Sequence, residues 1–440
     1  MLNPTPLLPV ERDGFSAVRG SVRAAPGGGV FARFMVFVGP GYLVATGYMD
    51  PGNWATSLAA GSQFGMKLLF VAVLSSLVAI LFQALSARLA FAADLDLAQA
   101  CRRHLPRPVA IFLWATQELA ILATDLAEVI GTAIGLGLLF GLPLWLGAIV
   151  TALDVTLILA FERFGFRKLE AFVIALLIVI ACCFALQVAL ARPDWGAAAR
   201  GLLPPADLLS NPTMLYLAAG IIGATIMPHN LFLHSGVVQT RATGPGLPAR
   251  REAIRFAMTD SAIALLFAMT INGAILILAA SAFFAHGQGE VTDLSQAYRL
   301  IAPILGAPIA AKLFGVALVA CGLNSSLTAT LAGQLIMDGF LRLRLRPVAR
   351  RLITRALTII PAVTVTALAG DAATGQLLVL SQVALSFALP FALAPLVWFT
   401  GSRQVMGPLV ASRAATYAAA ALAIGLSLLN LKLIYDAVTG

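Results

Sequence analysis

Asp50-Pro51-Gly52-Asn53 interrupts the first long apolar stretch of the chain, and Met227-Pro228-His229-Asn230 interrupts the sixth. Both tetrapeptides have the form X-Pro-X-Asn, and each falls where a membrane helix would cross the centre of the bilayer. Proline lacks an N–H and clashes with the preceding turn, so we expect both helices to split here. Backbone groups freed at that depth are tolerated only where they line a cavity or a site. Matching breaks in two halves therefore predict the binding site of a secondary transporter.

The composition around these breaks is that of a polytopic membrane protein. Of the 440 residues, 60% are hydrophobic and only 11% are charged, whereas a soluble domain carries roughly 25% charged residues. We predict an all-α protein with eleven apolar runs long enough to span a bilayer. They cover residues 35–64, 67–92, 108–139, 142–162, 169–191, 213–239, 256–284, 309–340, 352–369, 375–399 and 413–436.

The net charge of +9 predicts an orientation in the membrane rather than a nucleic-acid partner. Most of the 29 basic residues fall on one side of the predicted spans, and the other side holds only Lys67, Arg192, Arg200 and Arg299. By the positive-inside rule the N-terminus is cytoplasmic, and eleven crossings make the C-terminus extracytoplasmic. We expect a multi-pass protein of the cell inner membrane, embedded in the lipid bilayer and without an obligatory protein partner.

The first ten spans divide into two sets of five. An odd number of crossings makes the second set enter from the opposite face, which resembles a leucine-transporter-like 5+5 inverted repeat with broken helices 1 and 6. The predicted segments are a mostly disordered cytoplasmic tail (1–34), a first repeat (35–191), an extracellular loop (192–212), a second repeat (213–400), and an eleventh helix with the C-terminus (401–440). An ATP-driven pump is not indicated, because the chain lacks a Walker A sequence.

The residues at the breaks predict a metal site with mixed oxygen and sulfur ligands. Asp50 is an acid near the bilayer midplane, where such residues are costly and functional by default. Asn53 adds an amide oxygen, Met227 adds a thioether, and the break should free the carbonyl of Ala224. Mg²⁺ and Ca²⁺ prefer all-oxygen ligands, whereas a thioether favours softer transition ions. The structural alternative is that Asp50 caps the following half-helix and Met227 only fills the break.

A second set of ionisable residues lies on the third predicted span. The spacing of Glu118, Asp125 and Glu128 puts three acids on one helix face. Such an acid stripe within lipid indicates a wet path or basic partners, and Arg355 at the start of the ninth span is a candidate partner. The alternative is an ion-pair cluster with a purely structural role.

Two histidines accompany the second break. His229 lies inside it, and His234 follows about one turn later. Histidine titrates near neutral pH, so either residue could relay or sense protons, and either could instead be a structural residue with satisfied hydrogen bonds. Asp154 and Asp260 are expected to be structural, and Asn272 to line the cavity. The four cysteines show neither a disulfide framework nor a zinc spacing.

These motifs resemble the signature segments of the Nramp (natural resistance-associated macrophage protein) family of proton-coupled divalent-metal transporters. The similar segments are 39–41, 50–53, 227–235 and 324–334, and the resemblance covers roughly residues 35–436. The metal ligands that it implies are Asp50, Asn53, Met227 and the Ala224 carbonyl, joined by the Gly47 carbonyl and Gln382 as the cavity closes. The resemblance is closest to bacterial manganese transporters, and Met227 counts against a magnesium-carrying branch.

The resemblance also implies a proton exit route through the acid stripe. A proton would pass from Asp50 or its neighbours to Asp125 and Glu128 and leave near Arg355. The family often has two adjacent arginines at this place, and here Thr354 replaces one of them.

We therefore expect a secondary transporter that imports Mn²⁺, Fe²⁺ and related ions with H⁺ by alternating access, and that is not an enzyme and has no cofactor. Three alternatives stay open: an uncoupled or magnesium-carrying relative, a sodium-coupled amino-acid transporter of the same architecture, and a metal-sensing receptor or passive channel. Asp50 would repel the carboxylate of an amino acid, and Met227 would have no role in binding one. No nucleophile–base pair or zinc motif supports a membrane enzyme.

Overall fold

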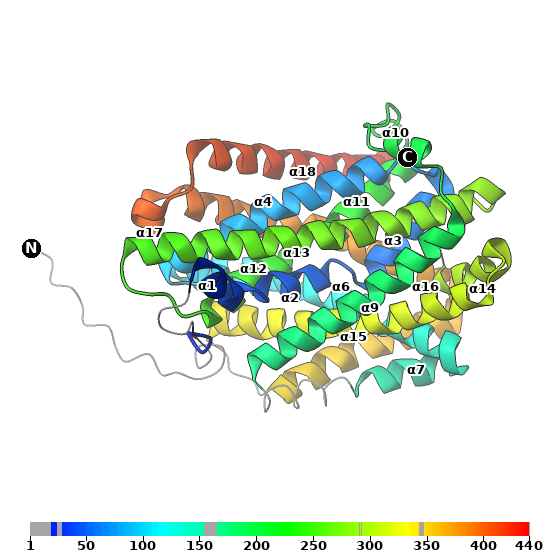
Figure 1. The fold of residues 1–440 in the computed structure, drawn as a ribbon, viewed down its shortest axis with the longest axis horizontal. Coiled ribbons are helices and arrows are strands. Elements are labelled where there is room, and N and C mark those ends of the chain that lie inside the picture. Colours follow the sequence, from blue (N-terminus) through cyan, green and yellow to red (C-terminus); the bar gives the residue numbers. More distant parts are fainter. Residues whose placement is uncertain are drawn as a thin grey trace, which may run out of the picture.

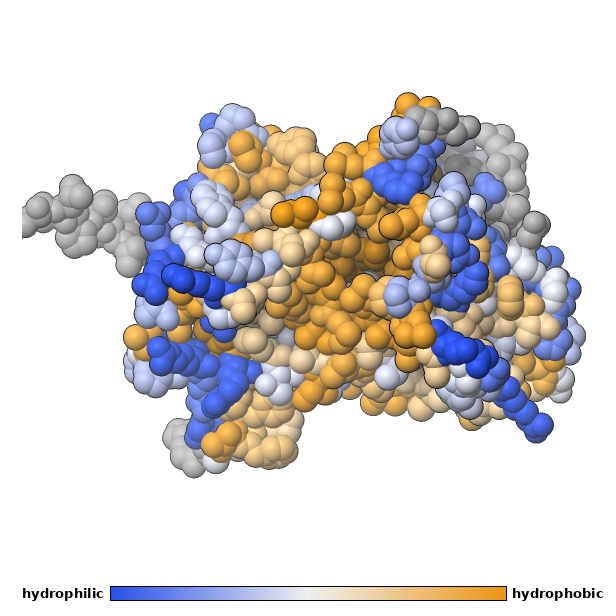
Figure 2. Space-filling view, turned by 90° about the horizontal axis from the view of Figure 1, so that it is seen from above, coloured by the Kyte–Doolittle hydropathy of each residue, from blue (hydrophilic) through white to orange (hydrophobic). Residues whose placement is uncertain are grey.

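The computed structural model describes residues 19–23, 29–153, 165–289, 291, 293–342 and 347–439. In this part of the chain almost every residue is helical, and the helices lie side by side in an elongated bundle (Figure 1). Hydrophobic residues cover the middle of the bundle and hydrophilic residues gather at its two ends (Figure 2). A bilayer requires this pattern, because its core satisfies no backbone or side-chain hydrogen bonds.

The helices of the first half surround the first break. They are α1 (Val30–Phe37), α2 (Pro40–Gly47), α3 (Pro51–Phe64), α4 (Leu69–Ala93), α5 (Leu97–His104), α6 (Arg107–Phe140), α7 (Leu144–Thr151), α9 (Phe166–Ala191) and α10 (Trp195–Arg200).

The helices of the second half surround the second break. They are α11 (Pro212–Ile226), α12 (Pro228–Val237), η2 (Val238–Thr240), α13 (Leu247–Ala282), η3 (Phe284–His286), α14 (Leu294–Leu305), α15 (Pro308–Leu341), α16 (Pro347–Gly401), α17 (Arg403–Met406), η4 (Gly407–Leu409) and α18 (Arg413–Thr439). In Figure 1, α17 lies at the left end of the bundle and α14 at the right; we call these the α17 end and the α14 end.

The predicted spans agree with the helices of the structure. Among the described residues, nine helical segments are long and apolar enough to cross a membrane, and Leu352–Thr364 is a shorter apolar helix. Ten of the eleven predicted spans thus have a helix. Of the remaining span, 142–162, residues 142–153 are described and include α7, and Asp154 lies outside the described residues. The all-α class and the breaks in the first and sixth spans are confirmed.

The ninth and tenth predicted spans lie in one helical element, α16, rather than in two separate helices. Arg355 Nη1 donates to the Asp125 carbonyl of α6 at 3.4 Å. Gln382 donates to Asp50, and the proline after Asp50 packs against Gly131 of the same α6. In a straight helix Arg355 and Gln382 would lie roughly 40 Å apart. The parts of α6 that they reach, at Asp125 and near Gly131, are less than two turns apart, so Arg355 and Gln382 must lie closer together than a straight helix allows. The chain therefore reverses within α16, and both predicted crossings remain.

The predicted disordered tail contains ordered residues. Val22 forms an isolated β-bridge with Arg241, and the Val22 N–H donates to the Thr240 carbonyl at 3.0 Å. α1 begins at Val30, inside the segment predicted as tail. The sequence pattern missed the bridge because it depends on a distant loop whose backbone groups need partners. Residues 1–18 and 24–28 lie outside the described part.

An additional break, which the sequence analysis did not predict, separates α1 from α2 at the α17 end. Arg241 donates to two carbonyls at the end of α1, at 2.9 and 3.0 Å, and pairs with Glu170 at 2.7 Å. Asp260 accepts from the amides of Gly39 and Gly41, at 3.2 and 2.7 Å. Gly39 has φ +135°, a conformation that a side chain would strain. Asp260 therefore has the structural role expected for it.

Candidate functional site

The first break places the Asp50 carboxylate at the start of α3. Pro51 is the first residue of α3, and Asp50 is buried and has an extended backbone. Asp50 Oδ1 accepts from the Asn53 N–H at 2.9 Å, and Oδ2 accepts from the Gly52 N–H at 3.2 Å. The cap considered as the structural alternative is therefore present. An ionised carboxylate offers about four acceptor positions, so capping does not exhaust Asp50 as a ligand.

The second break centres on Met227. Its backbone has φ +32°, which is unusual for a residue with a side chain, and Pro228 follows as the first residue of α12. The Met227 N–H donates to the Gly223 carbonyl at 3.2 Å and ends the hydrogen bonding of α11. Unfavourable backbone conformations of this kind cluster at functional sites. The break holds the Met227 thioether fully buried in the centre of the bundle.

Each break also leaves one carbonyl without its helical donor. In an α-helix the carbonyl of residue i accepts from the N–H of residue i+4. For Gly47 that residue is Pro51, and for Ala224 it is Pro228; neither proline has an N–H. Both carbonyls belong to buried residues. These are the two backbone ligands that the resemblance implied from the sequence.

Gln382 of α16 connects the two breaks. Its Nε2 donates to Asp50 Oδ2 at 3.0 Å. Its backbone carbonyl packs so closely on Gly223, beside Ala224, that a Cβ at Gly223 would collide with it. Gln382 Oε1 is buried and has no hydrogen-bond partner among the described residues. The structure thus brings Asp50, Gln382 and the end of α11 together, as the predicted ligand set requires.

Asn53 faces the same region but is held mainly through its nitrogen. Asn53 Nδ2 donates to the Tyr48 carbonyl, and Asn53 Oδ1 accepts only a long bond from Ser57 Oγ, at 3.4 Å. The Asn53 oxygen is therefore only weakly engaged. Asn272, expected to line the cavity, also donates to the Tyr48 carbonyl, at 3.0 Å.

Asn230 is a residue of the site that the sequence analysis left without a role. Its Nδ2 donates to the sulfur of Met227 at 3.4 Å, and its Oδ1 is buried without a partner in the described part of the chain. Its amide also lies against Gly47, where a Cβ would strike it. The repeated X-Pro-X-Asn form could have pointed to it, because Asn230 occupies the position in the second break that Asn53 occupies in the first.

The acid stripe of α6 is paired with two arginines of α16. Glu118 binds Arg350 at 2.8 Å, and Glu128 lies 3.7 Å from Arg355. Arg355 also donates to the Asp125 carbonyl and to Ser326 Oγ, the latter at 2.6 Å. The predicted contact of Arg355 with the stripe is present. Arg350 is a partner that the sequence analysis missed.

Both histidines of the second break are fully buried. His234 Nδ1 lies 3.1 Å from the Gln83 carbonyl. Neither ring nitrogen of His229 has a hydrogen-bond partner among the described residues. A buried polar atom without a partner is costly unless water or another group reaches it, so His229 does not have the satisfied hydrogen bonds of a purely structural histidine among the described residues.

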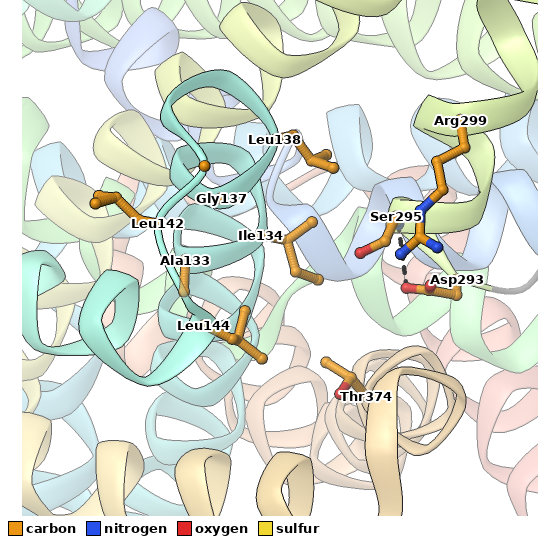
Figure 3. Close-up of a pocket in the computed structure, with 11 residues that line it drawn as sticks. Ala133, Ile134, Gly137, Leu138, Leu142, Leu144, Asp293, Ser295, Arg299 and Thr374 are labelled. Atoms are coloured by element: carbon orange, nitrogen blue, oxygen red, sulfur yellow. Dashed lines mark hydrogen bonds between the residues drawn. The ribbon is translucent and has the colours of Figure 1, made fainter.

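A cavity of about 230 Å³ lies between α6, α7, α14 and α16 at the α14 end. Figure 3 shows apolar side chains such as Ile134 and Leu144 on one side of it. Ser295 and Arg299 of α14 lie on the other side with Asp293, which caps this helix, and the Ser295 N–H donates to Asp293 at 3.1 Å. The cavity begins at Ala133, within one turn of the Gly131 contact with Pro51. It therefore lies on the α14 side of the first break.

Any metal site built from the described residues at the breaks would have mixed ligands. Among the described residues, no three His, Cys, Asp or Glu side chains are close enough to hold a metal ion together. A metal at the breaks would therefore depend on one carboxylate together with amide, thioether and carbonyl groups. Such a site favours softer divalent ions over Mg²⁺ and Ca²⁺.

The family of the chain follows from comparison with known proteins. The family model described as natural resistance-associated macrophage protein-like, or Nramp, matches residues 41–436. The chain is a member of the Nramp family. The family resemblance noted from the two break motifs is thereby confirmed.

Bacterial Nramp relatives match nearly the whole chain. A divalent metal cation transporter MntH from Agrobacterium fabrum is 58% identical, over 96% of this chain and 91% of the relative. Another MntH, from Xanthomonas campestris pv. campestris, is 56% identical, over 99% of this chain and 98% of the relative. Both relatives are thus described as transporters rather than enzymes, in agreement with the sequence analysis.

Solved structures place the Nramp chain in its fold class. The manganese transporter of Eremococcus coleocola has a TM-score of 0.86 and 40% identity, covering 94% of this chain and 89% of that one. Mhp1, a nucleobase-cation-symport-1 family transporter, has a TM-score of 0.61 at 17% identity, covering 90% of this chain and 89% of that one. The similarity to Mhp1 concerns the fold alone and confirms the leucine-transporter-like architecture.

Proposed function

We propose that this Nramp protein imports Mn²⁺, Fe²⁺ and related divalent ions together with H⁺, by alternating access. The observation that carries the proposal is that one carboxylate, Asp50, and one thioether, Met227, stand at two helix breaks that Gln382 connects. Relatives described as divalent metal cation or manganese transporters support the choice of cargo. The transported ion is the only metal in the proposal, and no cofactor takes part.

Metal binding uses groups that otherwise stay unsatisfied. The Gly47 and Ala224 carbonyls lack their helical donors, and Gln382 Oε1 is a buried oxygen without a partner in the described residues. The Asp50 carboxylate would neutralise part of the charge of a divalent ion. The two carbonyl oxygens and Gln382 Oε1 would coordinate the same ion. The site requires the ionised form of Asp50, so protons compete with the metal.

The proton leaves through the acid stripe in this proposal. Arg355 lies between Asp125, Glu128 and Ser326. A cavity of about 270 Å³ lined by Thr132, Thr151, Ser326 and Arg355 adjoins it. The rest of its lining is apolar and includes Leu136, Val319 and Leu323, so the waters that carry the proton in this proposal would bind at the four polar residues.

The broken helices move against the rest of the bundle. In transporters with inverted repeats, rocking around a central site exposes the site to each side in turn. The cavity in Figure 3 supports an approach from the α14 end, which we assign to the outside together with the C-terminus. The α17 end and the N-terminus are assigned to the cytoplasm, since basic residues concentrate there. The repeat boundaries remain those predicted, 35–191 and 213–400.

A sodium-coupled amino-acid transporter is the alternative with the same fold. Its substrate carboxylate would meet the carboxylate of Asp50, and the two negative charges would repel each other. Competition by amino acids for uptake separates this alternative from metal transport.

The proposal is tested with proteoliposomes that contain the purified protein. Mn²⁺ uptake and internal pH are followed together, with Ca²⁺ and Mg²⁺ as competitors. We expect saturable Mn²⁺ entry with acidification that Ca²⁺ and Mg²⁺ do not suppress. Mg²⁺ entry without acidification would instead show an uncoupled magnesium carrier and would overturn the proposal.

Met227→Ala is expected to weaken selectivity more than transport. Removing the thioether leaves an oxygen-only ligand set, which hard cations prefer. Mn²⁺ uptake should remain measurable, while Ca²⁺ or Mg²⁺ becomes a competitor and a substrate. The measurement is uptake of each ion by the parent and the variant under the same conditions. Parent-like discrimination against Ca²⁺ in the variant would show that the thioether does not select the metal.

Asn230→Leu is expected to raise the KM for Mn²⁺ by roughly fivefold, because it removes a hydrogen bond worth about 1 kcal/mol that orients the Met227 sulfur. Leucine has a similar size, so packing around Gly47 changes little. The double variant with Met227→Ala is the control. In the Met227→Ala background, Asn230→Leu should change the KM for Mn²⁺ little further. A fivefold rise in that background too would show that Asn230 does not act through the Met227 sulfur.

A further inference from the structure

A groove of about 1230 Å³ opens on the outer surface at the α17 end, away from the transport site. α13 forms one wall, and Arg88 of α4 with Pro408 and Leu409 of η4 forms the other. Met258 and Ile254 of α13 contribute to its lining. Along α13 the groove extends from Arg251, near the start of the helix, to Leu266.

The charge in this groove is strongly positive. Arg88, Arg251 and Arg255 line it, with Glu252 as an acid that also lines it. Glu252 pairs with Arg33 at 2.9 Å, so its charge is already compensated. Arg251 and Arg255 are exposed, and among the described residues neither forms an ion pair. Arg88 donates through Nη1 to the Leu409 and Val410 carbonyls, and a guanidinium has further N–H donors.

The exposed face of α13 changes from basic to apolar along the groove. Arg251, Arg255 and Thr259 follow each other at intervals of one turn, and Ile263 and Leu266 continue the same face. Ile263 and Leu266 are 46% and 42% exposed, which a membrane protein tolerates only toward lipid. The face from Arg251 to Leu266 is roughly 22 Å long. One leaflet of a bilayer, with its headgroups, is about as thick.

We propose that this groove binds an anionic phospholipid. The phosphate of the headgroup contacts Arg251 and Arg255 and remaining N–H donors of Arg88. The acyl chains lie along Ile263 and Leu266. Basic pockets between membrane helices on the cytoplasmic side characteristically hold anionic headgroups. A soluble anion would use the arginines but leave the apolar continuation of the groove without a ligand.

The test uses the full-length protein in detergent, incubated with equal amounts of phosphatidylglycerol and phosphatidylcholine that have identical acyl chains. Native mass spectrometry then counts the lipids that remain bound. We expect the parent to retain phosphatidylglycerol in preference to phosphatidylcholine. The double variant R251Q/R255Q should lose about tenfold or more of that retention.

The matched control is R403Q/R413Q, which removes two exposed arginines at the α17 end outside the groove. It should retain phosphatidylglycerol like the parent. Equal loss in both double variants, or equal retention of the two lipids by the parent, would overturn the proposal. If R251Q/R255Q does not fold, R255Q alone serves, since within the described part of the chain that guanidinium contacts only the Phe256 ring, at 6.0 Å.

Inorganic phosphate separates a lipid site from an anion site. Millimolar phosphate should not displace the retained phosphatidylglycerol, and Ile263→Ser should weaken lipid retention. Displacement by phosphate together with unchanged retention in Ile263→Ser would mean that the arginines bind a free anion, and the lipid proposal would then fail.

Discussion

Asp50→Ala is expected to abolish metal uptake, with a loss of more than about 100-fold. Asp50 is the carboxylate at the breaks. Its oxygens accept hydrogen bonds from two backbone amides of α3 and from the side chain of Gln382. Changes in groups that only orient a metal ligand already cost roughly 10–100-fold, so loss of the charged ligand should cost more. The measurement is Mn²⁺ uptake into proteoliposomes, with Mn²⁺ binding by calorimetry on the same preparation.

The matched control for this variant is Asp96→Ala. Asp96 is also a buried helix-capping acid, accepting from the Gln99 N–H at 2.8 Å, but it caps the short α5. Its loss should cost the roughly 0.5–2 kcal/mol of a cap and leave Mn²⁺ binding intact. Normal uptake by Asp50→Ala would remove the metal-site proposal, because the proposed ligand set contains no other carboxylate.

Arg355→Ala is expected to destabilise the protein by about 3–5 kcal/mol, because it breaks a buried ion pair and leaves an acid behind. Arg355 and Glu128 are 3% and 0% exposed at their side chains. The same change should uncouple proton entry from metal uptake if the acid stripe carries the proton. Both effects are measured on one preparation, by thermal unfolding in detergent and by acidification per Mn²⁺ transported.

Arg350→Ala is the comparison, since it breaks the neighbouring pair on the same two helices. Glu118 is 19% exposed and also accepts from Trp114 Nε1 at 3.2 Å. Water and the indole can replace part of what Arg350 supplies, so the loss of stability should be clearly smaller. Equal losses in the two variants, with normal acidification in both, would make the stripe a structural ion-pair cluster.

The helix breaks could be predicted from the sequence because their cause is local. Proline alters the hydrogen bonding of its own turn in any surroundings. Pro51 and Pro228 therefore predicted where α2 and α11 end. The spans followed from length and hydropathy alone. Resemblance then supplied Gln382, whose contact with Asp50 the structure places at 3.0 Å.

Contacts between distant segments could not be predicted in the same way. Arg350 became a partner of Glu118 only because α16 packs along α6 in one register. The reversal within α16, the bridge of Val22 to the loop at Arg241, and the bond from Asn230 to the Met227 sulfur also depend on tertiary packing. A one-dimensional pattern carries no information on register, so each of these required the three-dimensional structure.

The two prolines also affect how mutational data on this protein would be interpreted. The proposed ligands at Gly47 and Ala224 are backbone carbonyls, so a substitution scan cannot delete them and would score both positions as packing sites. The scan would instead penalise Pro51 and Pro228, because any other residue there restores an N–H that can occupy the carbonyl four residues earlier. A genetic map of the protein would thus place two of the six proposed metal ligands one helical turn away from their true positions.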